Sequence, residues 1–178
     1  RHAIIAGRTT LAANVATPIT LGIGAGTGGA SLTESELSSW LPTTTIAVGS
    51  HTMTLNSIIG TAARHRTVCA GPIMSNWIYR QAVTGSSHLV IWADVRLYKG
   101  GAVEIFPWVE NAYLNVASPA STTSTACSVT IGGASRFSQS ISIAHHTRIP
   151  LLTGSTFSYW SGTDPQITPA HNTSYLRA

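Results

Sequence analysis

Carboxylate, guanidinium and aromatic side chains alternate with apolar residues between positions 92 and 108. Aromatic rings can stack on the apolar faces of sugars, while carboxylates and a guanidinium can bind sugar hydroxyl groups. The same residue types, above all tryptophan, tyrosine and arginine, carry much of the binding energy of protein interfaces. This stretch therefore holds our candidates for a glycan-binding or subunit-interface surface. We call them the hairpin-face residues: Trp92, Asp94, Arg96, Tyr98, Glu104, Phe106 and Trp108.

The alternation itself predicts that a β-hairpin positions these side chains. Apolar residues occupy every second position of residues 89–97 and again of residues 103–109, and Lys99-Gly100-Gly101 separates the two runs. Glycine takes positive φ without steric cost, so a turn at this point can keep both apolar rows on one side of the hairpin. The hairpin-face residues then share the opposite side.

The predicted register places Arg96 opposite Glu104 and Trp92 opposite Trp108, with directly opposed side chains about 5 Å apart. Four aromatic rings are costly to leave in water, so we expect this face to pack against a second sheet or another subunit. Arg96 and Glu104 would then neutralise each other as a covered ion pair. The alternative is an exposed face that binds carbohydrate or a host receptor.

Catalytic chemistry has few candidate residues in this chain. It contains two aspartates and four glutamates, and Glu34 and Glu36 are assigned to a predicted helix N-terminus. No Gly-x-Ser-x-Gly elbow is present, and the glycine-rich run at residues 22–29 lacks the lysine of a phosphate-binding loop. We predict no catalytic residues and no cofactor. A polysaccharide-degrading enzyme with a histidine or carboxylate base is the second alternative function.

The densest imidazole cluster is His145-His146, which His171 could approach through the fold. Adjacent residues of a strand point to opposite faces, so the two histidines could not both ligate one metal ion without a bend. We expect structural roles for them and no metal site.

The composition favours a subunit packed against neighbours. Apolar residues make up 43% and charged residues 9%, against about 25% charged in ordinary soluble domains. The surface must then be polar through serine, threonine, asparagine and glutamine, which suits close packing, although a simply soluble low-charge domain is the alternative. The formal charge of +4 comes from nine arginines and the single lysine Lys99. Arg64-His65-Arg66 is predicted to be a solvated turn, and nothing else indicates a nucleic-acid partner.

The remaining patterns predict an all-β fold, an antiparallel β-sandwich or partly closed barrel, with one short helix near residues 34–41. Thr33 and Glu36 fit a capping box at the start of this helix, and Pro42 ends it. We expect one β-domain over residues 1–178, with no membrane span and no signal peptide. The other predicted strands cover residues 2–6, 17–23, 44–48, 52–55, 67–69, 77–83, 127–131, 136–143 and 157–160.

Residues 127–143 predict a second hairpin around Gly132-Gly133-Ala134, with Val129 near Phe137. Its outer face would carry a stripe of small hydroxyl side chains that fits either solvent or a close neighbour: Ser138, Ser140 and Ser142. Residues 118–125 are expected to form an exposed loop. Cys69 and Cys127 fit either one disulfide or two free buried thiols.

Three strings give the chain a resemblance to a known family. They are Gly71-Pro72-Ile73 through Trp77-Ile78, the run at residues 107–114, and the tail at residues 164–176. Together they resemble a group of bacteriophage and prophage proteins whose β-rich domain is more remotely similar to the N-terminal β-domain of exo-acting rhamnogalacturonan lyases.

The resemblance implies a virion component of the tail, its appendages or the capsid exterior, located in the phage particle and partnered by other virion subunits. A homo-oligomer is expected, and a host-surface glycan is the alternative partner. The resemblance also implies that the chain is a fragment or ordered part of a longer phage protein. The lyase family's catalytic residues lie outside such a β-domain, so none is carried over to this sequence, and we predict that the chain is not an enzyme.

Overall fold

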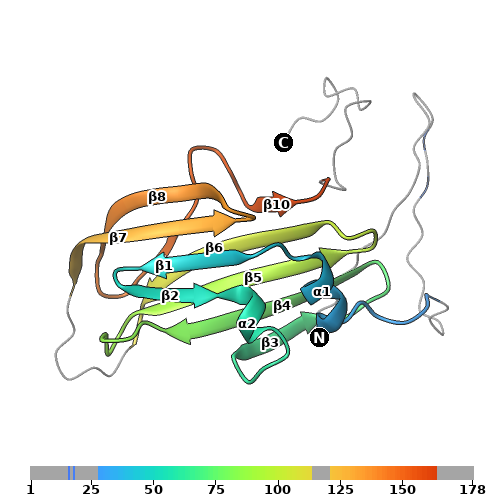
Figure 1. The fold of residues 1–178 in the computed structure, drawn as a ribbon, viewed down its shortest axis with the longest axis horizontal. Helices are drawn as coiled ribbons and strands as arrows, with labels where there is room; N and C mark the ends of the chain where they lie inside the picture. The colour runs from blue at the N-terminus through green and yellow to red at the C-terminus, as the bar shows by residue number, and fades with distance from the viewer. Residues whose placement is uncertain (1–15, 17, 19–27, 114–120, 164–178) are drawn as a thin grey trace.

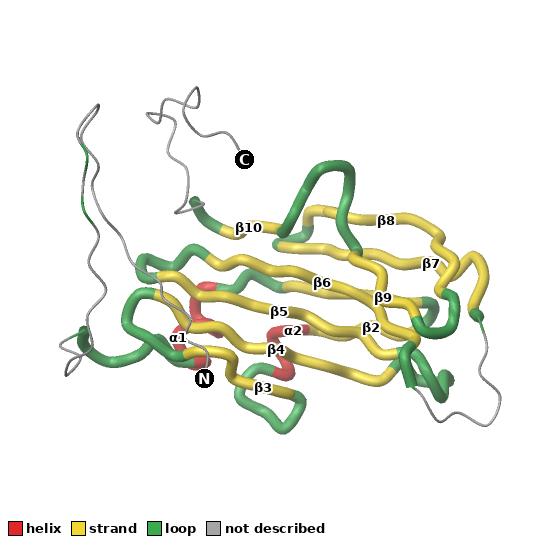
Figure 2. The backbone as a smooth tube through the Cα atoms, turned by 180° about the vertical axis from the view of Figure 1, so that it is seen from behind, coloured by secondary structure: helices red, strands yellow, loops and turns green. Residues whose placement is uncertain are grey.

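The computed structural model describes residues 16, 18, 28–113 and 121–163, which fold into two antiparallel β-sheets. One sheet has four strands in the order β2-β1-β7-β8. The other has six, in which β6-β5-β4-β3 are neighbours and both β9 and β10 pair with the remaining edge of β6. Figure 1 shows the four-stranded sheet in front of the six-stranded sheet, and Figure 2 shows the pair from behind. The predicted all-β fold is confirmed, as a sandwich of two sheets.

Each sheet combines strands from separate parts of the chain. The four-stranded sheet contains β1 (Thr44–Val48), β2 (His51–Thr54), β7 (Thr122–Ile131) and β8 (Ala134–Ile143). The six-stranded sheet contains β3 (Arg64–Cys69), β4 (Met74–Ala82), β5 (Val90–Tyr98), β6 (Val103–Asn111), β9 (Thr147–Pro150) and β10 (Tyr159–Ser161). The helices are α1 (Glu34–Trp40) and α2 (Leu55–Ile58), neither long and apolar enough to span a membrane.

The core lies between the sheets and is built from the inward-facing residues of each strand. On β5, Ile91, Ala93 and Val95 are fully buried, while the residues between them are partly exposed. The four-stranded sheet contributes Ile46 and Val129 to the same cluster. Side chains alternate between the two faces of a strand, so the period-two pattern of the sequence is the pattern that builds this core.

The predicted helix begins where its capping box indicates. The backbone N–H of Glu36 donates to the Thr33 hydroxyl, and the Glu36 carboxylate accepts from the Thr33 backbone N–H at 2.7 Å. A second helix, α2, differs from the sequence prediction, which continues the preceding strand through Leu55. Leu55 and Ile58 are both buried, because one helical turn points these two side chains into the core together.

Several predicted boundaries are wrong. Arg64-His65-Arg66 is not a turn but the start of β3, an exposed edge strand that forms because β4 supplies hydrogen bonds along one side. The expected loop at residues 118–125 is strand from Thr122 onward, because pairing with β8 extends the hairpin beyond its apolar residues. The last strand starts at Tyr159, and Phe157 lies outside it. The strands expected at 2–6 and 17–23 and the tail at 164–176 lie outside the described residues.

A buried tyrosine ties α1 to the six-stranded sheet. Tyr79 of β4 is fully buried, and its hydroxyl donates to Glu34 Oε1 at 2.6 Å. The Glu34 carboxylate also accepts from the Gly60 backbone N–H and forms an ion pair with Arg64. Burial, together with the bond to Glu34, raises the pKa of the Tyr79 phenol well above its ordinary range, so the hydroxyl remains a donor at any physiological pH.

The first prediction concerns this contact. Tyr79→Phe should lower the free energy of unfolding by about 1.5–3 kcal/mol, because it removes a buried hydrogen bond to a charged acceptor. Tyr113→Phe is the matched control, since the Tyr113 hydroxyl is exposed and accepts a hydrogen bond from Arg80, and it should change stability by no more than about 0.5 kcal/mol. Urea unfolding of the three proteins measures both effects, and equal losses in the two variants would contradict the prediction.

Candidate functional site

The seven hairpin-face residues lie together on one side of the hairpin, as the sequence predicts. That side is the outer face of the six-stranded sheet, so the four-stranded sheet does not cover it, although packing against a second sheet was one of the two expectations. The register pairs Trp92 with Trp108 and Arg96 with Glu104, and both pairings were expected. Tyr98 Oη donates to Glu104 Oε2 at 3.0 Å, which brings Tyr98 onto the same surface. The surface divides into a polar half near the Lys99-Gly100-Gly101 turn and an aromatic half farther along the strands.

Glu104 is the centre of the polar half. Its Oε2 accepts from Arg96 Nη1 at 3.0 Å, as well as from Tyr98, and its Oε1 accepts from Ser158 Oγ at 2.7 Å. Glu104 is 9% exposed, so these donors replace the water that a carboxylate requires. Such a fully engaged carboxylate has a structural role in the sheet.

Asp94 lies on the other side of Arg96. Its carboxylate is 3.5 Å from Arg96 Nε and accepts a hydrogen bond from the Asn76 side chain. Burial raises the pKa of Asp94 above its ordinary value of 3.8, and this effect outweighs the opposing effects of Arg96 and the Asn76 bond. The charge of Glu104 raises it further. Burial lowers the pKa of Arg96, but the charges of Asp94 and Glu104 together outweigh this effect, so the pKa of Arg96 is raised.

The aromatic half is organised around a stacked pair of tryptophans. The rings of Trp92 and Trp108 are stacked nearly parallel, with an angle of 5° between their planes and 5.7 Å between their centroids. The Arg80 guanidinium lies over Trp92 and the Arg148 guanidinium lies over Trp108, each 5.1 Å from the ring centroid. We call this arrangement the tryptophan–arginine row: Arg80, Trp92, Trp108 and Arg148.

The two arginines change how the aromatic surface can be used. Trp108 is 6% exposed and Trp92 is partly exposed, so the pair is not an open platform for a ligand. Arg148 is held by Glu110, and Arg80 donates to Tyr113 Oη at 2.9 Å. Cation–π contact of this kind contributes about 0.5–2 kcal/mol per pair. The row therefore presents guanidinium groups, backed by indole rings, to whatever lies above it.

Sequence reasoning missed both arginines of the row. Arg80 comes from β4, where it is opposite Trp92, and Arg148 comes from β9, far along the chain. The pattern of one hairpin contains no signal for either. Arg80 could have been found only by extending the register to β4.

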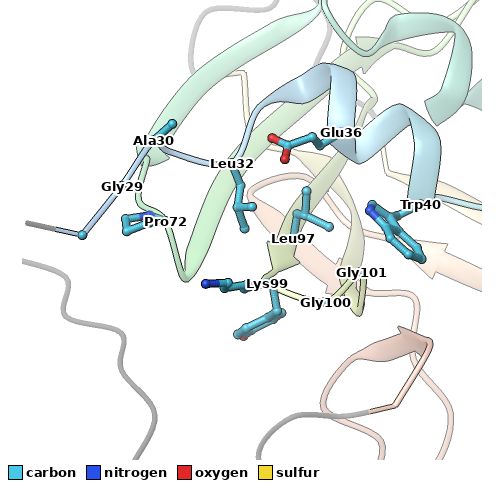
Figure 3. A pocket seen from close by; sticks show the side chains of 12 residues that line it. Gly29, Ala30, Leu32, Glu36, Trp40, Pro72, Leu97, Lys99, Gly100 and Gly101 are labelled. Carbon is cyan, nitrogen blue, oxygen red and sulfur yellow. The ribbon is translucent and has the colours of Figure 1, made fainter.

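The structure also reveals a surface cavity that the sequence did not indicate, because its walls come from separate segments. It has a volume of about 340 Å³ and lies beside the Lys99-Gly100-Gly101 turn, where α1 and the end of β5 meet (Figure 3). Trp40 of α1 is 56% exposed, and its ring lies directly on the backbone of Gly101. Polar and aromatic side chains from three segments line the cavity: Glu36, Trp40, Tyr98 and Lys99.

The interpretation of His145-His146 is corrected by the structure. The two residues lie in the turn between β8 and β9 instead of on a strand, and His146 has a positive φ of 61°. Their rings are therefore close, with centroids 3.8 Å apart, and do not point to opposite faces. Among the described residues, no group of three or more histidines, cysteines and carboxylates is arranged to hold a metal ion. His171 lies outside the described residues.

The two cysteines are free thiols on different sheets, Cys69 on β3 and Cys127 on β7. Burial raises the pKa of Cys127 to about 11 and also raises that of Cys69. Because the thiolate is the reactive form, neither thiol is activated as a nucleophile.

Comparisons of the chain with protein-family models, with curated proteins and with solved structures found no match.

The second prediction follows from the raised pKa of Asp94. The stability contributed by its protonated form is fully present below pH 3.8 and is lost as the pH rises through the raised folded-state value. Asp94→Asn cannot titrate, so its stability relative to the natural chain should increase from acidic pH to about pH 7. Chemical denaturation at several pH values measures this difference, and parallel pH profiles for the two proteins would refute it.

Proposed function

We propose that this chain is a structural subunit of a bacteriophage particle, in the tail, an appendage or the capsid exterior, and that it acts through contacts with other subunits. The tryptophan–arginine row is the observation that carries the proposal. Arginine and tryptophan are the residues that protein interfaces use as energetic centres, because both combine a large flat surface with directed polar groups. The resemblance to phage and prophage proteins supports the same function.

The electrostatics of the outer face also support a packing role. Arg148, Arg96 and Arg80 have partners within the chain: a carboxylate for the first two, a tyrosine hydroxyl for Arg80. An interface formed here would bury guanidinium groups already largely compensated, so the cost of desolvating them is reduced. With charged residues at 9% of the chain, few long-range charges oppose the approach of a second subunit.

The third prediction concerns the presence of the chain in phage particles. Particles of the phage or prophage that encodes the chain should contain it at a fixed number of copies, measured by quantitative peptide mass spectrometry of particles purified on a density gradient. The host lysate freed of particles is the control, because a secreted or cytosolic enzyme would be concentrated there. Absence of the chain from intact particles would overturn the proposal.

The same proposal predicts which residues matter for assembly. Trp108 is too deeply buried for a clean test, since truncating a buried tryptophan removes about 3–5 kcal/mol of stability. Arg148 has a side chain 60% exposed, so Arg148→Ala should reduce incorporation into particles while the chain still folds, at a cost of about 0.5–2 kcal/mol for the lost contact with Trp108. Thr52→Ala, at an exposed position on the four-stranded sheet, is the control and should be incorporated normally. Equal incorporation of both variants would show that the tryptophan–arginine row does not contribute to the subunit interface.

A second candidate function, carbohydrate binding, is favoured by the cavity beside Trp40. An indole ring with one face fixed on Gly101 and more than half of its surface exposed can stack on a sugar ring. Glu36, whose Oε2 accepts from Thr33, and Lys99 bring polar groups to the same cavity, and its volume of about 340 Å³ accommodates a small saccharide. This cavity suits a glycan better than the hairpin face does, because arginines cover the rings of the row.

The fourth prediction tests this candidate. A host-surface oligosaccharide that binds the chain on a glycan array should change the tryptophan fluorescence, and Trp40→Ala should abolish that change and lower the affinity about two- to tenfold, since one stacking contact is worth about 0.5–1.5 kcal/mol. Phe157→Ala is the control, because Phe157 is 88% exposed but lies away from the cavity lining. Unchanged affinity in Trp40→Ala, or no binding on the array, would exclude the cavity as a glycan site.

A further inference from the structure

The edges of the two sheets differ in how well they are protected from pairing with another chain. An unpaired strand edge exposes backbone N–H and C=O groups, and proteins usually shorten, bend or charge such edges. The edge strand β2 has four residues, and β9 and β10 have four and three. The edge strand β3 has two irregularities of register and begins with Arg64-His65-Arg66. Each of these edges carries at least one of the usual protections.

The edge strand β8 is the least protected, because its pairing with β7 is regular from Phe137 to Ile141 and irregular only beyond these two residues. It has ten residues, is the last strand of its sheet, and has no strand on its other side among the residues the structure describes. Arg136 is its single charged residue. Ser138, Ser140 and Ser142 are all exposed and lie on its outer face, as the sequence predicts. Small side chains of this kind leave the backbone open to close approach by another strand.

The strand is also held firmly in place. Tyr159 Oη donates to the Arg136 carbonyl at 3.3 Å, and the Asn111 side chain donates to the Ile143 carbonyl at 3.3 Å. Both donors come from the six-stranded sheet, so each end of β8 is fixed to the opposite layer. A rigid edge loses little conformational freedom when a partner strand adds to it, which favours association.

We propose that β8 pairs antiparallel with β8 of a second copy of this chain, about a two-fold axis at Gln139, so that the two four-stranded sheets join into one. This names a partner for the subunit contacts proposed above and rests on that function. In this register Ser138 faces Ser140 of the second copy, and Phe137 faces Ile141 of the second copy. The sequence is therefore self-complementary about Gln139, with hydroxyls opposite hydroxyls and apolar residues opposite apolar residues.

The charge distribution also fits a second copy. Arg136 lies just outside the regular stretch 137–141, so the two Arg136 side chains would lie at opposite ends of the paired region and no like charges would face each other. The partly buried Ile141 would gain an apolar neighbour across the axis, which continues the interior layer from one copy into the next. A closed two-fold contact of this kind uses up the edge in both copies and leaves none for further growth.

The fifth prediction tests both the pairing and its register with two double variants. Ser138→Lys/Ser140→Lys places like charges opposite each other twice across the axis, whereas Ser138→Lys/Ser140→Glu places opposite charges there. The dissociation constant of the dimer, measured by sedimentation velocity over a range of concentrations, should rise about tenfold in the first variant and not rise in the second. The control Ser50→Lys/Thr52→Lys adds the same charge at two exposed positions, one in the turn before β2 and one on β2 at the other edge, and should leave the dimer unchanged.

Thermal unfolding of each variant verifies that the monomers remain folded. A chain that is monomeric at all concentrations, or a dimer that responds equally to both β8 variants, would overturn the pairing. Neither result bears on whether the chain is present in particles, so failure of the edge pairing and failure of the virion function are distinguished.

Discussion

The pairing of β5 with β6 is the constraint on which the rest of the structure depends. Side chains alternate between the two faces of each strand, so a slip of one residue would turn every apolar side chain out of the core. The turn prevents this slip: Gly100 and Gly101 have positive φ values of 100° and 91°, and the Tyr98 backbone N–H donates to Ala102 O at 2.9 Å. Once that register is fixed, it determines both which side chains of β5 and β6 enter the core and which lie on the hairpin face.

The outer face then shows how the chain keeps four aromatic rings in place with few charges. Neighbouring strands β4 and β9 supply arginines that lie over the two stacked tryptophans, while the Arg96 guanidinium links Asp94 and Glu104. Arg80 and Arg148 each serve at once as a cover for an indole ring and as a hydrogen-bond donor. The three guanidinium groups consequently have partners within the chain.

What could be predicted from the sequence depends on interactions close together along the chain. The register of β5 with β6 follows from one turn and two alternating runs, and α1 follows from the capping contact between Thr33 and Glu36. The positions of Arg80 and Arg148 depend on pairings of β4 with β5 and β6 with β9, which no local pattern specifies. Residues 122–125 contain no large apolar side chain, yet they continue β7 because β8 extends alongside them. Threonine is enriched in strands, so the propensity of this segment agrees with the pairing, and it is the lack of large apolar residues that suggests a loop.

The use of arginine in place of lysine connects the fold with the proposed function. The chain has nine arginines and one lysine, although either residue would supply the same charge. A guanidinium is planar and weakly hydrated, so it can stack on an indole and bind a carboxylate at the same time, whereas an ammonium group on a flexible stem does neither as well. Arg148 does both, over Trp108 and with Glu110. A surface built this way loses less entropy and less hydration when another subunit covers it, and that property distinguishes a surface suited to assembly from one that is merely soluble.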